Sequence, residues 1–288
     1  MFEELWLPFT EFAFMQHALL GCLALSISAP PVGVFLMLRR MSLTGDAMAH
    51  AILPGAALGY LVSGLSLGAM TIGGLLAGLA VVAASGLVAR TTVLREDTSL
   101  AAFYLLSLAL GVVIISSQGR NVDLLHVLFG SVLALDTTAV AFLAGVAAVT
   151  VVALTLLYRP LVLECLDPAF LRSVSRWSPV AHYGFLALLV LNLVAGFQAL
   201  GTLLAVGMMI LPAATARFWV RELRPMLAVA VAFSALGSTI GLWLSYQFEW
   251  PSGPAIVLTL GGVYLLSVFV GPRGAVRSRR VPAHHLKA

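Results

Sequence analysis

Long, nearly uninterrupted apolar stretches restrict the fold of this chain more than any other feature. Nine runs, separated by polar residues or by glycine and proline, approach the roughly 20 apolar residues that a membrane-crossing helix needs. The runs are continuous and do not alternate between apolar and polar residues, so they predict helices and not the strands of a barrel. We therefore predict an all-α, polytopic membrane bundle with spans at residues 17–38, 46–64, 68–89, 99–117, 139–158, 181–198, 200–219, 226–246 and 254–271.

The number of spans depends on how the breaks between runs are interpreted. At residues 42–45 and 198–201, one kinked or broken helix would give the same pattern as two separate helices. A tenth run, at residues 124–135, is too short to cross a membrane and predicts a re-entrant or short external helix. The pattern thus predicts eight or nine transmembrane helices, some of them broken.

Charged residues are too few for a soluble protein of 288 residues. They make up 10% of the chain, whereas a soluble domain has about 25%, and 61% of the residues are hydrophobic. We expect one transmembrane domain over residues 1–272 and a basic tail over residues 273–288. Lys287 is the single lysine, so the chain contains no lysine-bearing phosphate loop. The chain is therefore not expected to be an enzyme, and any ATP hydrolysis must be performed by another subunit.

The basic residues indicate an orientation. If all nine runs cross the membrane, fifteen basic residues lie on one side and Arg120 alone lies on the other. The positive-inside rule then places the C-terminus in the cytoplasm and the N-terminus outside. Because the basic residues are distributed in this way, we interpret the net charge of +4 as favouring contact with a membrane and not with nucleic acid. The fifteen residues are Arg39, Arg40, Arg90, Arg95, Arg159, Arg172, Arg176, Arg217, Arg221, Arg224, Arg273, Arg277, Arg279, Arg280 and Lys287.

Asp46 and His50 are the candidate ion-binding residues. Eleven of the twelve carboxylates fall in loops or at span ends, whereas Asp46 begins an apolar run. A separation of four residues places the carboxylate and the imidazole on one face of a helix, where they can converge on one ion. Ionisable residues within spans are costly and mark ion pathways. The alternative is a hydrogen bond that only pairs two polar side chains within the bundle.

Two prolines within apolar runs predict interrupted helices. Pro54 cannot donate to the carbonyl of His50, so we expect a kink there and a free oxygen beside the candidate pair. Pro212 interrupts a second helix in the same way next to Met208, whose thioether is a possible soft ligand although methionine usually serves packing. Because broken helices line cavities in transporters, Pro54, Met208 and Pro212 are candidate path-lining residues.

Two other functional classes fit parts of the sequence. An intramembrane hydrolase would need a metal or a nucleophile, but Ala51 follows His50, so the H-E-x-x-H pattern is absent. Residues 64–68 match G-x-S-x-G, but no strand precedes this short turn and no histidine partner is evident, so we interpret the match as chance. A proton-coupled secondary transporter stays open, because Asp46 and His50 could form a proton relay.

The longest polar stretch between spans covers residues 158–179 and lies on the arginine-rich side. Asp167 followed by Pro168 is typical of a helix N-cap with proline at the first helical position, so a short helix is expected at residues 169–174. With Phe170 and Arg172 on it, this helix could dock into a groove of a partner protein. The spacing alone is equally compatible with an ordinary surface turn.

Residues 39–55, RRMSLTGDAMAHAILPG, resemble the second-helix signature of the permease family of ABC importers for zinc, manganese and iron. Three further stretches agree with this family in order: residues 123–131, then Glu164 with Asp167 and Pro168, then residues 211–216. The chain departs from the family pattern at residues 173–175, where a glycine is common, and at His126, where a serine is common. Family members usually have eight spans.

The resemblance implies a permease in the bacterial inner membrane that pairs with a second permease copy, usually identical. It also implies two cytoplasmic ATP-binding subunits and an external metal-binding protein. Asp46 and His50 would lie in the path of the transported ion, with no permanently bound cofactor. The loop with Glu164, Asp167, Phe170 and Arg172 would contact the ATP-binding subunit. Zinc, manganese and iron all remain open as the transported metal, because carboxylate and imidazole ligands suit each of them.

Overall fold

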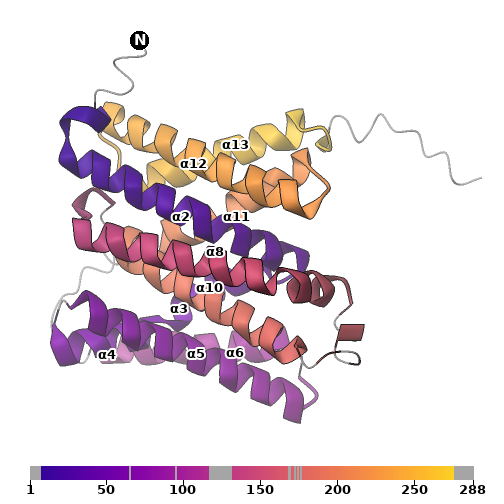
Figure 1. Cartoon of the computed structure of the whole chain (residues 1–288). Helices are drawn as coiled ribbons and strands as arrows, with labels where there is room; N and C mark the ends of the chain where they lie inside the picture. Colours follow the sequence, from indigo (N-terminus) through magenta and orange to yellow (C-terminus); the bar gives the residue numbers. More distant parts are fainter. Residues whose placement is uncertain are drawn as a thin grey trace, which may run out of the picture.

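The structure, a computed structural model, describes residues 8–275 except 65, 95, 117–131, 168–169, 172, 174 and 176. The described residues form helices and connecting turns and contain no strand, as the apolar runs predict (Figure 1). The elements with stated bounds are α2 (Ala13–Leu38), α3 (Ser42–Ala51), α4 (Leu53–Ser63), α5 (Leu67–Thr91), α6 (Glu96–Ser116), the short 3₁₀ turn η1 (Val132–Ala134), α8 (Thr137–Leu166), α10 (Ser178–Leu200), α11 (Thr202–Trp219), α12 (Leu223–Phe248) and α13 (Ser252–Val270).

Eight helices among the described residues are long and apolar enough to cross a membrane: α2, α5, α6, α8, α10, α11, α12 and α13. The ninth run, at residues 46–64, is divided into α3 and α4, which have 10 and 11 residues. At 1.5 Å per residue each of these is about 15 Å long, half of the hydrocarbon thickness of a bilayer. The count of eight or nine spans is therefore explained by one crossing that is made from two short helices. Of the expected short external helix, only residues 132–135 lie among the described residues.

The helix breaks at Ile52, two residues before Pro54. Pro54 lies in the first turn of α4, where its missing N–H removes no intrahelical bond. Ser107 of α6 donates a hydrogen bond of 2.7 Å to the carbonyl of Ala51, so the neighbouring helix satisfies an oxygen at the break. The predicted break is confirmed, but the predicted free carbonyl is wrong. The carbonyl of His50 accepts the backbone N–H of Ile52.

Glycines bring α4 against α5. A Cβ atom added to Gly55 would overlap the carbonyl group of Gly73, and one added to Gly59 would overlap that of Ala69. The backbones therefore touch directly, as small residues permit in membrane bundles. This contact fixes α4 to α5, whereas α3, on the other side of the break, packs against α10 and α11; both short helices also pack against α6.

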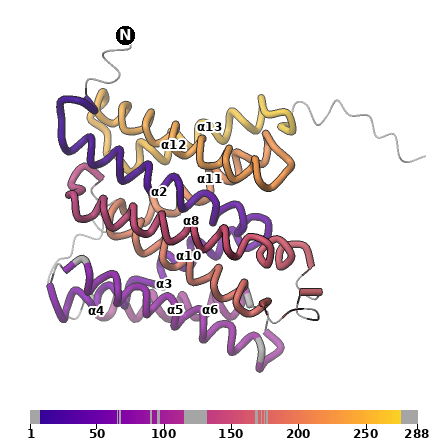
Figure 2. The backbone as a smooth tube through the Cα atoms, in the orientation of Figure 1, coloured from indigo at the N-terminus to yellow at the C-terminus, as the bar shows by residue number. Residues whose placement is uncertain are grey.

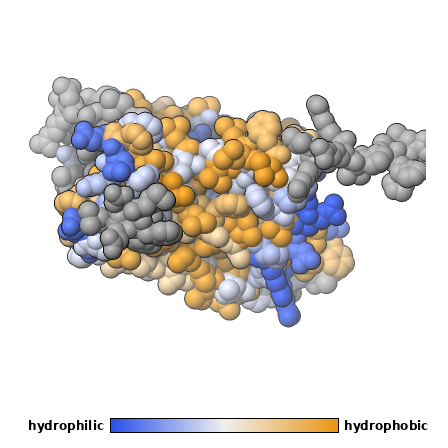
Figure 3. All heavy atoms as spheres, turned by 90° about the horizontal axis from the view of Figure 1, so that it is seen from above, coloured by the Kyte–Doolittle hydropathy of each residue, from blue (hydrophilic) through white to orange (hydrophobic). Residues whose placement is uncertain are grey.

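The centre of the bundle is formed by α2 and α10. In the apolar 18-residue segment of each helix, 72% of the residues of α2 and 67% of those of α10 are buried inside the protein. The corresponding share is 33% for α8 and for α12. Figure 2 shows these two helices crossing the middle of the bundle. The outer helices expose apolar side chains instead, and Figure 3 shows hydrophobic residues over the middle of one face with hydrophilic residues toward both ends. Such a surface suits a lipid environment.

Basic residues gather at the end of the bundle where α11 and α13 finish and α12 begins. Desolvation, together with the nearby side chains of Arg221 and Arg217, lowers the pKa of Arg273. The guanidinium of Arg224 at the start of α12 lies over the ring of Tyr158 in α8. The last described turns of α13 and the N-terminal part of α2 lie at opposite ends of the bundle (Figure 1). The described basic residues thus follow the asymmetry that the sequence predicts.

Candidate functional site

Asp46 and His50 lie on one face of α3 and point toward the same space. Nε2 of His50 and Oδ1 of Asp46 are 3.9 Å apart, too far for a hydrogen bond. The exposed fraction is 65% for the Asp46 side chain and 30% for that of His50. Nδ1 of His50 is buried and has no hydrogen-bond partner among the described residues. The alternative in which the two residues only hydrogen-bond to each other is therefore not realised in this conformation.

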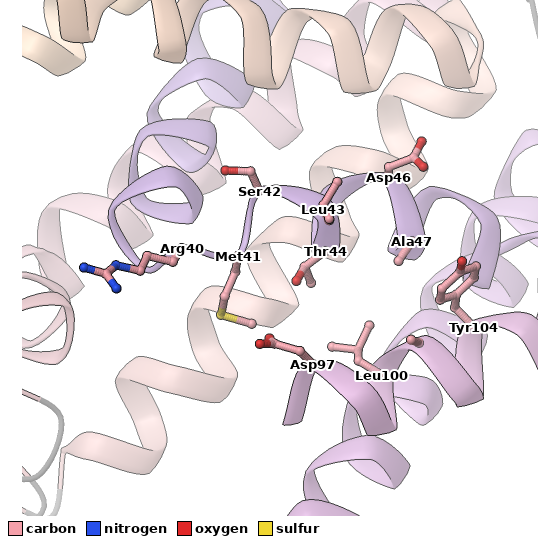
Figure 4. Close-up of a pocket in the computed structure, with 11 residues that line it drawn as sticks. Arg40, Met41, Ser42, Leu43, Thr44, Asp46, Ala47, Asp97, Leu100 and Tyr104 are labelled. Atoms are coloured by element: carbon pink, nitrogen blue, oxygen red, sulfur yellow. The ribbon is translucent and has the colours of Figure 1, made fainter. Parts of the chain in front are cut away.

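Two cavities meet at Asp46. The first, of about 450 Å³, lies between α3 and α6, and its polar wall includes Thr44, Asp97 and Tyr104. Figure 4 shows Asp46 at the margin of this cavity, with its carboxylate directed away from Asp97. The second, of about 460 Å³, lies between α3, α11 and α13 and is lined by both Asp46 and His50. Asp46 thus borders both cavities, whereas His50 borders only the second.

The pair supplies too few ligands to enclose a metal ion. Among the described residues, no group of three or more histidine, cysteine, aspartate or glutamate side chains is placed to hold a metal. One carboxylate and one imidazole are half of the four ligands that a closed tetrahedral site requires. The described part of one chain therefore forms no site of three or more such side chains, and the pair is compatible with a transient or shared site.

The candidate path-lining residues lie in packed surroundings. Met208 is completely buried, and Pro212 is buried within α11, which continues as one helix from Thr202 to Trp219. The predicted interruption at Pro212 is therefore wrong. Pro54 is buried and packs against Gly111 of α6. None of the three lines the two cavities at Asp46, so a path-lining role for them stays a prediction. In α11 the wall of the second cavity is formed by Thr202, Leu203, Val206, Gly207, Ile210 and Leu211.

Glu164 is a buried residue of the bundle and not part of an exposed loop. Helix α8 continues through Pro160 to Leu166, eight residues beyond the predicted span. Ser178 Oγ donates a hydrogen bond of 3.0 Å to Oε2 of Glu164, and Nδ1 of His182 lies 3.9 Å from Oε1. The guanidinium of Arg39 contacts the same Nδ1 atom. The expected position of Glu164 in a loop is therefore wrong, because it lies in the last turns of α8 with Ser178 and His182 of α10 beside its carboxylate.

Asp167 is the N-cap that its sequence context predicts. Its Oδ1 accepts a hydrogen bond of 2.9 Å from the backbone N–H of Phe170. Phe170, Leu171 and Ser173 are helical. The Phe170 side chain is 52% exposed, while Leu171 is 3% exposed and anchors the turn. The turn therefore presents an aromatic side chain at the arginine-rich end. Arg172 lies outside the described residues.

The serine of the G-x-S-x-G match has a structural role. Ser66 precedes α5, and its Oγ accepts the backbone N–H of Ala69 at 3.5 Å. This is the position of a helix N-cap. The observation supports the interpretation of the match as chance.

Comparison with known proteins decides the family. Residues 11–271 match the ABC 3 transport family. The chain belongs to this family. It is 33% identical to the manganese import system permease protein ScaB of Streptococcus gordonii, over 98% of this chain and all of ScaB. It is 28% identical to the chelated iron transport system membrane protein YfeD of Yersinia pestis, over 95% of this chain and 91% of YfeD. A chain in the structure of PsaBC from Streptococcus pneumoniae in complex with Fab superposes with a TM-score of 0.84 at 32% identity, covering 97% of this chain and 99% of that one.

This member of the ABC 3 transport family is thus a membrane permease subunit, and the resemblance seen in residues 39–55 is confirmed. The sequence interpretation missed the polar cluster around Glu164. A signal was present, since Ser178 and His182 are four residues apart and therefore share a helix face at the start of an apolar run. Their partners Glu164 and Arg39 come from other helices, and no local pattern connects them.

Proposed function

We propose that this permease moves a divalent transition metal ion across the membrane, with manganese as the first candidate and iron as the second. The observation that carries the proposal is that Asp46 and His50 lie side by side, without a mutual hydrogen bond, on the wall of one cavity, and that Asp46 also borders a second cavity. The names of the relatives supply the metals, since ScaB is named for manganese and YfeD for chelated iron. Oxygen and imidazole ligands suit both ions, and zinc as well.

A second copy of the chain would complete the ligand set. A two-fold axis beside α3 would bring two carboxylates and two imidazoles together, and symmetric dimers are the commonest oligomers. The ions enter and leave such a site more easily than a closed structural site, because no single chain holds all the ligands. Binding that is too strong would prevent release, which transport requires.

Energy and metal delivery come from partner proteins in this proposal. The chain has no lysine-bearing phosphate loop, so two ATP-binding subunits would hydrolyse ATP on the cytoplasmic side of the inner membrane. They would dock at the turn capped by Asp167, where Phe170 is exposed, with Arg172 also taking part in the contact, and buried Glu164 would hold the end of α8 against Ser178 of α10 next to this turn. An external metal-binding protein would deliver the ion. The basic end, with the C-terminus, would face the cytoplasm.

Uptake of radioactive manganese by cells that express the complete importer tests the proposal. Asp46→Ala and His50→Ala should each abolish uptake without reducing the amount of folded permease, because each removes half of the ligands that one copy supplies. Asp97→Ala is the matched control, since it removes a carboxylate from the wall of the first cavity on α6. If both α3 variants took up as much manganese as the wild type, the proposal would be contradicted. Competition by iron or zinc would rank the metals.

A second measurement separates ATP-driven import from proton-coupled transport. The permease is reconstituted into vesicles with and without its ATP-binding subunits. Manganese should accumulate only when these subunits and ATP are present. Accumulation that a proton gradient alone drives would instead support a secondary transporter with Asp46 and His50 as its proton relay.

A further inference from the structure

A groove of about 580 Å³ runs along the flank of the bundle between α2, α8 and α12. Its floor is α2, with Ile27, Pro31 and Phe35. Figure 1 shows α2 between α8 and α12 on the face turned to the viewer. The groove shares no lining residue with the two cavities at Asp46, which are bordered by α3, α6, α11 and α13. It is therefore a separate feature of the fold.

The walls of the groove are apolar for most of its length. Val151 and Leu154 of α8 form one wall, and Leu227 and Val231 of α12 form the other. Ile27 on the floor is 47% exposed, although it lies in the helix with the largest buried share. Apolar walls around an accessible apolar floor favour a hydrocarbon occupant over water.

One end of the groove is basic and aromatic. Arg224, the second residue of α12, lines this end, and its guanidinium carbon lies 5.8 Å from the centroid of the Tyr158 ring. This distance is within the range of a cation–π contact, which orients the guanidinium over the groove. Tyrosine and arginine together are typical of the membrane–water interface, because each has an apolar stem and a polar tip. The groove thus has a charged mouth and an apolar interior.

The dimensions match one leaflet of a bilayer. From Val151 to Tyr158, α8 advances seven residues, or about 10 Å, and α2 advances about 12 Å from Ile27 to Phe35. Half of the hydrocarbon core is about 15 Å thick. A chain that enters at Arg224 would therefore be covered by the groove over most of its depth in the leaflet.

We propose that this groove binds one anionic phospholipid from the leaflet at the arginine-rich side. The phosphate and anionic headgroup lie at Arg224 and Tyr158, and one acyl chain follows α2 between α8 and α12. Basic pockets between transmembrane helices are suited to anionic headgroups. In the dimer proposed above, whose two-fold axis lies beside α3, the second copy would leave the groove uncovered, because the groove lies between α2, α8 and α12.

Native mass spectrometry of the purified full-length chain tests the proposal. The protein is delipidated and titrated with equal amounts of phosphatidylglycerol and phosphatidylcholine. The wild type should retain one phosphatidylglycerol in preference to phosphatidylcholine, and Arg224→Gln should reduce this preference about fivefold, the contribution of one arginine near a membrane surface. Arg221→Gln is the matched control, because Arg221 is an exposed arginine at the same end that does not line the groove.

A second variant tests the apolar part independently of the charge. Ala228→Phe places a large side chain in the groove and should reduce retention of both lipids, while leaving the elution and thermal unfolding of the protein unchanged. The proposal is overturned if the wild type shows no preference for phosphatidylglycerol, or if Arg224→Gln and Arg221→Gln lower the preference equally. It is also overturned if Ala228→Phe retains both lipids as the wild type does. None of these measurements depends on metal transport.

Discussion

Glu164 and Asp167 are three residues apart, but Glu164 is buried and Asp167 caps an exposed turn, so we expect a global loss of stability from changing the first and a local loss from changing the second. Glu164 is 7% exposed and accepts a hydrogen bond from Ser178. Glu164→Ala should lower the free energy of unfolding by about 2 kcal/mol, because it leaves the buried hydroxyl of Ser178 without its acceptor. Glu164→Gln, which keeps an acceptor for Ser178, should cost less. Thermal unfolding in detergent measures both, and equal stability of Glu164→Ala and the wild type would contradict the prediction.

Asp167→Ala should act locally and leave the bundle intact. The side chain caps the turn by accepting the N–H of Phe170, and loss of a cap costs about 1 kcal/mol. Hydrogen exchange of the Phe170 amide should therefore become about fivefold faster while global unfolding is unchanged. Asp136→Ala is the control, since it removes the equivalent cap of α8 at Ala139 and should affect exchange only there. Unchanged exchange at Phe170 would show that the cap does not hold the turn.

At these sites, a contact could be predicted from the sequence when the two residues that make it lie close together along the chain. The pairing of Asp46 with His50 and the cap at Asp167 depend on residues three or four positions apart, so the helical period alone predicts them. The burial of Glu164 depends on Ser178, His182 and Arg39, which three-dimensional packing brings together. No spacing rule reaches across such separations.

The contact between α4 and α5 depends on glycine, and this predicts a position-specific effect of alanine. Gly55→Ala should destabilise the bundle by about 1–3 kcal/mol, because its Cβ would overlap the carbonyl of Gly73 and force the helices apart. Gly145→Ala in α8 is the matched control, since a Cβ there meets nothing within 4 Å. That control should be neutral or should stabilise by up to about 1 kcal/mol through helix propensity. Equal unfolding temperatures for the two variants would contradict the packing argument.

The helices themselves are largely predictable, because an apolar run long enough to span lipid has few alternatives to a helix. What the sequence could not decide is the effect of each proline. Pro54 lies in the first turn after the break at Ile52, where Ser107 of the neighbouring helix satisfies the carbonyl of Ala51. Pro160 and Pro212 lie inside continuous helices. A proline ends a helix only where the surrounding structure offers its backbone another partner, and this information lies in the packing.

For the bundle as a whole, the charge asymmetry predicts one orientation in the membrane. In a Cys165→Ser background, an impermeant thiol reagent should label Thr138→Cys in intact cells, because the predicted orientation places the start of α8 outside. Arg221→Cys, at the basic end, should be labelled only after the membrane is opened. Both positions are exposed, so access and not burial decides the result. If Arg221→Cys were labelled in intact cells, the basic end would face outward. This result would contradict the predicted orientation and the proposed contact with the ATP-binding subunits.

Because of the break at Ile52, a small rotation of α3 would move Asp46 and His50 relative to the rest of the bundle. Helix α4 is fixed to α5 by backbone contact, whereas α3 is attached to it through a single non-helical residue. Asp46 lies six residues before Ile52, or about 9 Å along the helix axis. A tilt of α3 by about 5° about Ile52 would displace Asp46 by about 0.8 Å, whereas metal–ligand distances tolerate only about 0.2 Å. A rotation too small to disturb the packing of the long helices would therefore suffice to assemble or dismantle a coordination sphere.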